Sequence, residues 1–261
     1  MDLSDYIAAG RSVLVFTGAG ISTASGIPDF RGPQGVWNTR RPVFFDEFVA
    51  SEEARSRYWQ QKLEDRRAWS DARPNAVHHA IVALERAGRV GMVVTQNIDG
   101  LHRAAGSSVD RLVEVHGTTA EVACLDCDAR SDPEPHFAAF ASSGRAPVCR
   151  CGGLLKPATI SFGQNLRSDD IERAFAAAAE CDLVVALGSS LSVTPAANIP
   201  LAAARRGAPY VIVNRGPTEH DDHPAVTLRV EADVLDVFPT AVAAALDQPP
   251  RPTPNLGTSH S

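Results

Sequence analysis

The sequence lacks any apolar run that approaches the roughly 18 residues needed to cross a bilayer. Its first residues, MDLSDYIAAGRS, include early acidic side chains and no apolar core of signal-peptide length. An excess of positive charge is also absent, because 25 Lys and Arg stand against 31 Asp and Glu, for a net charge of −6. General binders of phosphate backbones usually present a basic face. We therefore expect a soluble, cytoplasmic protein that binds neither a membrane nor a specific nucleic acid, and we expect a monomer.

Apolar runs that suit strands alternate along the chain with patterns that suit helices. Residues 12–16, 90–97 and 210–216 predict strands, and residues 75–88 and 171–180 predict helices. Nearly continuous apolar strands alternating with helices are typical of a parallel sheet covered on both faces. Polar phrases follow the strands as GAGIS, TQNIDG, GSSLS and VNRG, where ligands bind in such sheets. The predicted fold is α/β, with a Rossmann-like sheet and one shared cleft.

Two segments interrupt this alternation. Residues 36–73 are charged and helix-prone, and residues 119–157 hold four of the five cysteines. We predict that these helical and cysteine-rich insertions together form a smaller module. The Rossmann-like domain is then discontinuous and is predicted to comprise residues 1–35, 74–118 and 158–247. The tail, residues 248–261, is rich in proline and polar residues and is expected to be disordered.

The GAGIS phrase follows the first predicted strand directly. A glycine-rich turn at a helix start presents backbone N–H groups and a positive dipole end to a phosphate. Only two of the three glycines of a dinucleotide fingerprint are present, however, and the acidic residue expected about 20 positions later is not in place. From these residues alone, an ordinary tight turn is as good an interpretation as a phosphate site.

The cysteines form two close pairs, Cys124-x-x-Cys127 and Cys149-x-Cys151. Four thiolates in two pairs suit a closed tetrahedral zinc site, which would be structural because no ligand position stays open. The second pair has one intervening residue instead of two. The alternative is four unrelated buried cysteines, and Cys181 is expected to be a small buried hydrophobe.

Other polar residues near the predicted strand ends offer chemistry. His116 ends a short apolar stretch, where a neutral imidazole beside a cleft would suit a general base near pH 7. His102 follows NIDGL and could orient its neighbours, whereas His78 lies in a helical pattern, where packing or solvent contact is expected. Asn97 and Asp99 could hold ribose hydroxyls and a carboxamide, or form an Asx turn.

These phrases together resemble the sirtuins, the NAD-dependent protein deacylases. The match rests on the two cysteine pairs and on GAGISTASGIPDFRG (18–32), TQNIDGLHRAAG (95–106), HGT (116–118), CGGLLKP with ISFG (151–163), GSSLSVTPA (188–196) and VNRGPT (213–218). It covers nearly the whole chain up to about Phe238, and the order of its phrases is highly specific.

The resemblance implies a site for NAD as a consumed co-substrate, with the residues Gly18, Ala19, Gly20, Ile27, Asp29, Phe30, Arg31, Gln96, Asn97, Ile98, Asp99, Gly188, Ser189, Ser190, Asn214 and Ala232. It implies one structural Zn²⁺, held by Cys124, Cys127, Cys149 and Cys151. The partner would be an acylated-lysine protein or peptide, whose backbone pairs as an added strand with Ile160, Ser161, Phe162 and Gly163.

The implied reaction begins when the acyl oxygen attacks the nicotinamide ribose and nicotinamide leaves. His116, with Asn97 as the second catalytic residue, then activates a ribose hydroxyl, and the products are lysine, nicotinamide and O-acyl-ADP-ribose. Sirtuins that prefer succinyl groups carry Tyr-x-x-Arg, whereas Tyr58 is followed at the fourth place by Gln61. We therefore expect an uncharged acyl group, acetyl first. The alternatives are a protein mono-ADP-ribosyltransferase and a dinucleotide-sensing module without turnover.

Overall fold

A computed structural model describes residues 1–30, 32 and 35–248. Its larger sheet has six strands, and each neighbouring pair is parallel. In spatial order these strands are β3 (Leu112–Glu114), β2 (Val90–Thr95), β1 (Val13–Thr17), β7 (Leu183–Leu187), β8 (Tyr210–Asn214) and β9 (Leu228–Glu231). The order reverses between β1 and β7, which makes that boundary the switch point of a doubly wound sheet. The α/β, Rossmann-like prediction is confirmed.

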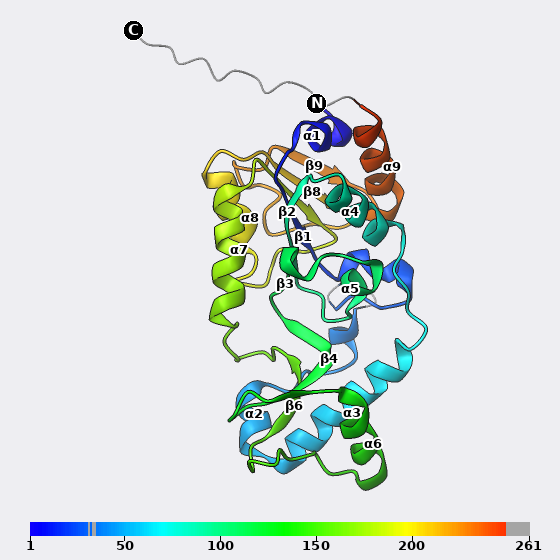
Figure 1. Ribbon diagram of the computed structural model, residues 1–261, viewed down its shortest axis with the longest axis vertical. Coiled ribbons are helices and arrows are strands. Elements are labelled where there is room, and N and C mark those ends of the chain that lie inside the picture. Colours follow the sequence, from blue (N-terminus) through cyan, green and yellow to red (C-terminus); the bar gives the residue numbers. More distant parts are fainter. Residues whose placement is uncertain (31, 33–34, 249–261) are drawn as a thin grey trace.

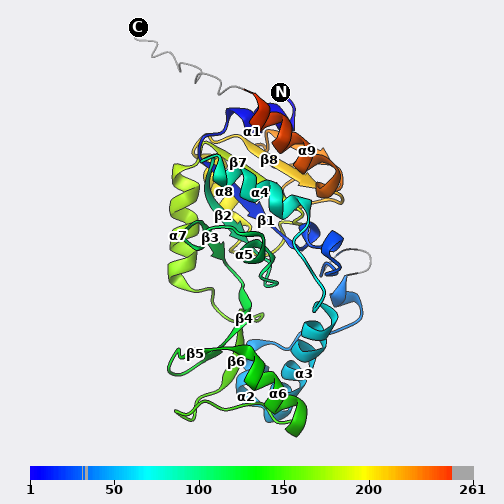
Figure 2. The same ribbon diagram turned by 45° about the vertical axis from the view of Figure 1, so that its right-hand side comes forward.

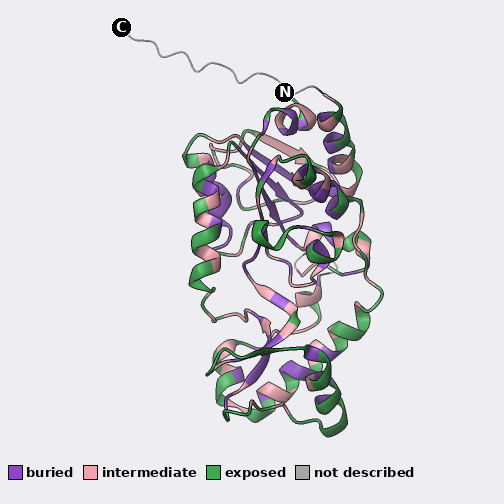
Figure 3. Cartoon of the chain, in the orientation of Figure 1, coloured by how far each residue is buried: buried purple, intermediate pink, exposed green. Residues whose placement is uncertain are grey.

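Helices cover both faces of the large sheet, as Figure 1 shows. One face is covered by α1 (Leu3–Ala9), α4 (Ala76–Arg86) and α9 (Val234–Asp247), and the other by α7 (Ser168–Glu180) and α8 (Asn198–Arg205). The central strands are purple in Figure 3 because both of their faces are buried. Alternate strand residues therefore enter opposite cores, which explains why these strands read as continuous apolar runs.

A smaller module lies beyond the carboxyl ends of the main strands. Its sheet is antiparallel, with the order β5 (Arg130–Ser131), β4 (Gly117–Cys124) and β6 (Leu155–Thr159). The helices α2 (Phe45–Ala50), α3 (Glu52–Ala68) and α6 (Pro133–Ser143) surround it. In Figure 2, β4 enters this module on one side, and the chain between α3 and α4 leaves it on the other. The expected domain boundary at residues 157/158 falls inside β6.

The helical and cysteine-rich segments share one hydrophobic core. Trp59 of α3 is fully buried, donates its indole N–H to Leu155 O at 3.2 Å, and meets the Phe137 ring of α6 at 5.0 Å between centroids. Phe140 lies against the same indole. Burying a large aromatic side chain is worth about 1.5–3 kcal/mol, so each segment stabilises the other.

Two expectations from the sequence concern membrane-spanning helices and the C-terminal tail. No helix among the described residues is long and apolar enough to cross a membrane. The predicted disordered tail lies outside the described residues from position 249 onward.

Candidate functional site

A cavity of about 1070 Å³ opens at the switch point of the large sheet and extends to the smaller module. Its walls come from the loops after β1, β2, β7 and β8, and from α3 and the chain after β6. Small-molecule sites are commonly about 300–1,000 Å³. The space therefore suits a ligand as large as a dinucleotide together with a second group.

The glycine turn after β1 packs backbone to backbone against the loop after β7. The N–H groups of Gly18 and Gly20 donate to Leu187 O at 3.0 Å and to Gly188 O at 2.8 Å. A Cβ on Gly18 would lie 2.7 Å from Gly188 O, and one on Gly20 would lie 2.9 Å from Gly188 Cα. These glycines leave the cavity floor free of side chains, and their two N–H groups are already used within the protein.

The glycine turn leads into short 3₁₀ helices and not into an α-helix. Residues Ala19–Ile21 and Thr23–Ser25 form two short 3₁₀ turns, and Gly26 adopts a φ of +85°. Side chains also bond to main-chain carbonyls here, since Thr23 Oγ1 donates to Gly20 O at 3.0 Å and the Asn75 amide donates to Ile21 O at 2.8 Å. A helix dipole is thus not available to a phosphate at this turn.

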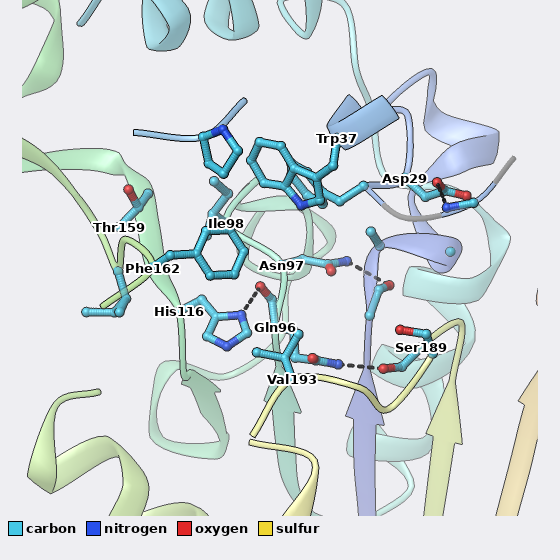
Figure 4. Close-up of a pocket in the computed structure, with 18 of the residues that line it drawn as sticks. Asp29, Trp37, Gln96, Asn97, Ile98, His116, Thr159, Phe162, Ser189 and Val193 are labelled. Carbon is cyan, nitrogen blue, oxygen red and sulfur yellow. Dashed lines mark hydrogen bonds between the residues drawn. The ribbon is translucent and has the colours of Figure 1, made fainter. Parts of the chain in front are cut away.

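The loop after β2 places two amide side chains beside the glycine turn. Asn97 is buried and donates to Gly18 O at 3.1 Å and to Ser22 Oγ at 3.2 Å. The Ser22 hydroxyl donates in turn to Asp99 Oδ2 at 2.7 Å, and burial raises the pKa of Asp99. Gln96 reaches the other loop and donates to Ser189 Oγ at 2.7 Å (Figure 4). The two amides therefore tie the three loops together.

His116 lies in the cavity wall just before β4. Its Nδ1 lies 3.0 Å from Gln96 O, the contact drawn in Figure 4. A carbonyl oxygen only accepts hydrogen bonds, so Nδ1 carries the proton of the neutral ring and Nε2 is the basic nitrogen. The geometry therefore provides a base of defined tautomer at the cavity.

Aromatic rings form the wall shared by the glycine-turn loop and the chain after β6. Trp37 stacks on Phe30 at 5.1 Å between centroids and meets Phe162 edge-on at 5.8 Å. Figure 4 shows the Trp37 and Phe162 rings on one side of Asn97 and His116. Sequence reasoning missed Trp37. One signal could have found it, because it is one of only three tryptophans and lies five residues after Gly32, the end of the GIPDFRG phrase.

The far end of the cavity is polar. Tyr58, Gln61, Lys62 and Asp65 line it from one face of α3, spaced three, four and seven residues after the first. Asp65 is ion-paired with Arg40, and its other oxygen lies 3.8 Å from Lys62 Nζ. Burial lowers the pKa of Lys62, and Asp65 opposes this shift. Arg40 Nη1 also lies 3.5 Å from Glu64 Oε2, so the two cations at this end face two carboxylates.

The cavity brings together most of the residues expected at the NAD and substrate sites. Among the described residues, its lining includes Gly18, Ala19, Gly20, Asp29, Phe30, Gln96, Asn97, Ile98, His116, Ile160, Ser161, Phe162, Gly163, Gly188, Ser189, Ser190 and Asn214. It does not include Ile27, Asp99 or Ala232, although Asp233 and Val234 beside Ala232 do line it. Arg31 lies outside the described residues.

The four cysteines gather at the far end of β4, with every pair of sulfurs within 4.8 Å. Cys124 Sγ lies 3.6 Å from Cys151 Sγ, and Cys127 Sγ lies 3.8 Å from Cys149 Sγ. Tetrahedral zinc with Zn–S bonds near 2.3 Å requires sulfurs about 3.8 Å apart, so these residues fit the ion. A turn closes around the short Cys149-x-Cys151 pair, because Gly152 N–H donates to Cys149 O at 2.9 Å.

Comparison with known proteins places this geometry in a family. The family model described as the Sir2 family matches residues 18–195. The chain belongs to the Sir2 family. An NAD-dependent protein deacetylase of Rhodopseudomonas palustris is 44% identical over 228 residues, which cover 87% of this chain and 90% of that protein.

Two solved Sir2 structures share the fold of this sirtuin. One, from work on the mechanism and regulation of Sir2 enzymes, has a TM-score of 0.82 at 37% identity and covers 93% of this chain and 96% of its own. The other is a Sir2 variant with a deacetylated p53 peptide and 3′-O-acetyl ADP ribose. It has a TM-score of 0.80 at 36% identity and covers 92% of this chain and 95% of its own. The sequence-based assignment to the sirtuins is confirmed.

Proposed function

We propose that this sirtuin is an NAD-dependent protein-lysine deacetylase that releases nicotinamide and O-acetyl-ADP-ribose. The observation that carries the proposal is the 3.0 Å contact between His116 Nδ1 and Gln96 O, which makes Nε2 a base in the cavity wall. Family membership and the deacetylase name of the R. palustris relative support the same reaction.

NAD would lie across the switch point as a consumed substrate. Gly18 and Gly20 would contribute room, because their N–H groups already bond to the loop after β7. Ala19, Ser189 and Ser190 would meet the phosphates and a ribose, and Asn214 the adenosine ribose. Ala232 remains the predicted contact to the adenine edge.

His116 would accept a proton from a ribose hydroxyl through Nε2 once nicotinamide has left. The imidazolium formed in this way is stabilised because Gln96 O still accepts the Nδ1 proton. Asn97 would orient the ribose, since its own amide is held by Gly18 O and Ser22 Oγ. The rings of Trp37 and Phe162 would exclude water from the reacting carbon.

An acetyl or other uncharged acyl group fits the polar end of the cavity best. A succinyl carboxylate would need a cation there, and Asp65 and Glu64 already pair with Arg40 and Lys62. Gln61 offers only a neutral amide at the position where an arginine would bind the acid. We therefore propose that acetyl-lysine is turned over faster than succinyl-lysine.

Incubation with nicotinamide-labelled and adenine-labelled NAD and an acetyl-lysine peptide tests this function. We expect equal amounts of nicotinamide and acetyl-ADP-ribose, and the loss of both acetyl-ADP-ribose and free lysine in His116→Ala. The matched control is His79→Ala, because His79 is an exposed imidazole on α4, away from the cavity.

Three outcomes would contradict the proposal. Adenine label retained on the protein or peptide would indicate ADP-ribosyl transfer instead. Nicotinamide release that ignores the acyl peptide would contradict the mechanism, and no consumption of NAD would leave a sensing module. Faster turnover of a succinyl peptide would overturn the acyl preference alone.

We further propose that Ile160, Ser161, Phe162 and Gly163 hold the peptide backbone as an added strand. Support comes from their place after β6, where Ile160 N–H donates to His116 O at 2.7 Å. The monomeric state, the cytoplasmic location and the division of the chain into two domains also stay proposals.

A further inference from the structure

Two histidines outside the cavity wall form a buried pair behind the site. His78 of α4 and His102 of α5 (Leu101–Ala105) are 0% and 1% exposed, and their ring centroids lie 5.1 Å apart. Neither ring is among the described residues that line the cavity. The reaction proposed above gives this pair no part, yet burying two imidazoles without an ion pair costs folding free energy.

A line of hydrogen bonds runs from His102 to the loop that carries Gln96 and Asn97. His102 Nε2 lies 3.0 Å from Thr17 Oγ1, and the Thr17 hydroxyl donates to Thr95 Oγ1 at 2.8 Å. Thr95 Oγ1 accepts the Asn97 main-chain N–H at 3.0 Å. Every side chain in this line is buried, so each bond is protected from exchange with water.

The direction of this line fixes the tautomer of His102. A threonine hydroxyl has one proton, and that of Thr17 goes to Thr95. The bond between His102 and Thr17 must therefore be donated by Nε2–H, which leaves Nδ1 unprotonated in the neutral ring. His102 Nδ1 is buried and has no hydrogen-bond partner among the described residues.

The same line reaches the base of the reaction. Gln96 N–H donates to Thr17 O at 3.0 Å, so Thr17 and Thr95 hold the Gln96–Asn97 segment from both strands. Gln96 O is the atom that orients His116. Two hydrogen-bonded side chains, those of Thr17 and Thr95, thus connect the buried His102 to the segment that sets the tautomer of His116.

His78 connects the pair to the glycine turn. Its Nδ1 lies 3.3 Å from Asn75 N and 3.2 Å from Asn75 Oδ1. The Asn75 amide donates to Ile21 O at 2.8 Å and to Ser25 Oγ at 2.9 Å. The two imidazoles consequently lie between the loop after β1 and the loop after β2.

We propose that His102, supported by His78, is a positioning residue that holds the Gln96–Asn97 segment, and through it His116, in register with the glycine turn. The kinetic part of this assignment rests on the proposed deacetylase function, whereas the tautomer and the hydrogen-bond line do not. Losing the line leaves a buried donor or acceptor unpaired and lets the segment shift.

The first test is spectroscopic. With histidine labelled by ¹⁵N, the His102 ring at pH 7 should show Nε2 protonated and Nδ1 unprotonated. In His102→Leu, the Asn97 amide should exchange with solvent faster than in the parent protein. A protonated Nδ1, or unchanged exchange at Asn97, would overturn the assignment even if the protein proved to have no deacetylase activity.

The second test compares two substitutions of the central hydroxyl. Thr17→Val removes the hydroxyl at nearly constant volume, and Thr17→Ser keeps it. We expect Thr17→Val to lower kcat by on the order of 10- to 100-fold, because a misplaced catalytic group can cost about that much. The KM for the acetyl peptide should stay near that of the parent protein, and Thr17→Ser should recover most of the loss.

A control in the same strand separates positioning from general loosening. Val93 of β2 lies two residues before Thr95 and is fully buried, but its side chain has no polar atom. Val93→Ala should lower the Tm yet leave kcat nearly unchanged. Equal losses of kcat in Val93→Ala and Thr17→Val, or wild-type kcat in Thr17→Val, would overturn the proposal. A parent protein without turnover would instead contradict the proposed function.

Discussion

Burial decides the protonation of individual side chains around the site. Burial lowers the pKa of His78 to about 4 and that of His102 to about 3, and the neighbouring histidines His79 and His78 add smaller shifts in the same direction. Both rings are therefore neutral at physiological pH, as the hydrogen-bond line requires. Asp99 and Glu114 are shifted the other way, because burial raises the pKa of each carboxyl.

The two buried histidines predict acid sensitivity of the fold. Below about pH 6.5 the unfolded chain binds protons at both positions, while the folded chain does not until about pH 4 and 3. Protonation of these histidines therefore does not lower the free energy of unfolding above pH 6.5. It lowers that free energy progressively as the pH falls toward 4 at His78 and toward 3 at His102. We expect each histidine to lower the free energy of unfolding by on the order of 2 kcal/mol between pH 7 and 4.5.

This loss can be measured by urea unfolding at a series of pH values from 7.5 to 4.5. The parent protein is compared with a variant that carries His78→Gln and His102→Gln. The variant should be less stable at pH 7.5 but show a flatter decline, because only the parent loses these two contributions. Asp99 and Glu114 act in the opposite sense in both proteins and cancel in the comparison. An equal decline of the free energy of unfolding with pH in the two proteins would contradict the lowered pKa values of His78 and His102.

At the scale of elements, the site depends on two loops whose backbones touch. The turn after β1 and the loop after β7 meet at the switch point, and Gly20 approaches Gly188 more closely than any side chain permits. Gly188 also adopts a φ of +61°, a conformation that favours glycine. The cavity floor is consequently a backbone surface, with room for phosphates.

Gly20→Ala tests the contact between the loops. Its Cβ would lie 2.9 Å from backbone atoms of Gly188, so we expect a loss of about 1–3 kcal/mol and a large rise in the Kd for NAD. The control is Gly91→Ala in β2, whose Cβ would come too close only to the Ser12 hydroxyl, a group that can rotate away. Thermal unfolding and calorimetric titration with NAD measure both. Unchanged NAD binding in Gly20→Ala would contradict this account.

At the scale of the whole molecule, the smaller module links the four-cysteine cluster to the cavity wall. Strand β4 begins at Gly117, directly after His116, and ends at Cys124 of the four-cysteine cluster. Strand β6 pairs with β4 and leads to Ile160. Helix α3 packs into the same core through Trp59. A change in the packing around the cysteines would therefore reach the parts of the cavity wall formed by α3 and the chain after β6.

Removal of zinc should therefore abolish deacetylation without unfolding the large sheet. We expect a chelator, or Cys151→Ser, to shift Trp fluorescence as the core around Trp59 loosens, while far-UV circular dichroism keeps most of its helical signal. Cys181→Ser is the control, because Cys181 lies directly after α7, outside the cysteine cluster. Full activity after complete removal of zinc would contradict the proposed coupling.

Local pattern was sufficient for several features. The continuous apolar runs of β1, β7 and β8 predicted a covered parallel sheet, because both faces of such a strand must be apolar. The paired cysteines predicted zinc, because four thiolates at short spacing have few other uses. The phrases around Asn97 and His116 identified the family because their order along the chain is specific.

Only the tertiary structure decided the rest. Two 3₁₀ turns follow Gly18, and the amide of Asn75, distant in sequence, donates to Ile21 O within them. Trp37 entered the cavity wall and His102 joined a line to Asn97 through contacts between separate strands and loops. Sequence spacing determines which residues are available along one element. It cannot determine which atoms meet across elements, because that depends on how the sheet and the smaller module pack together.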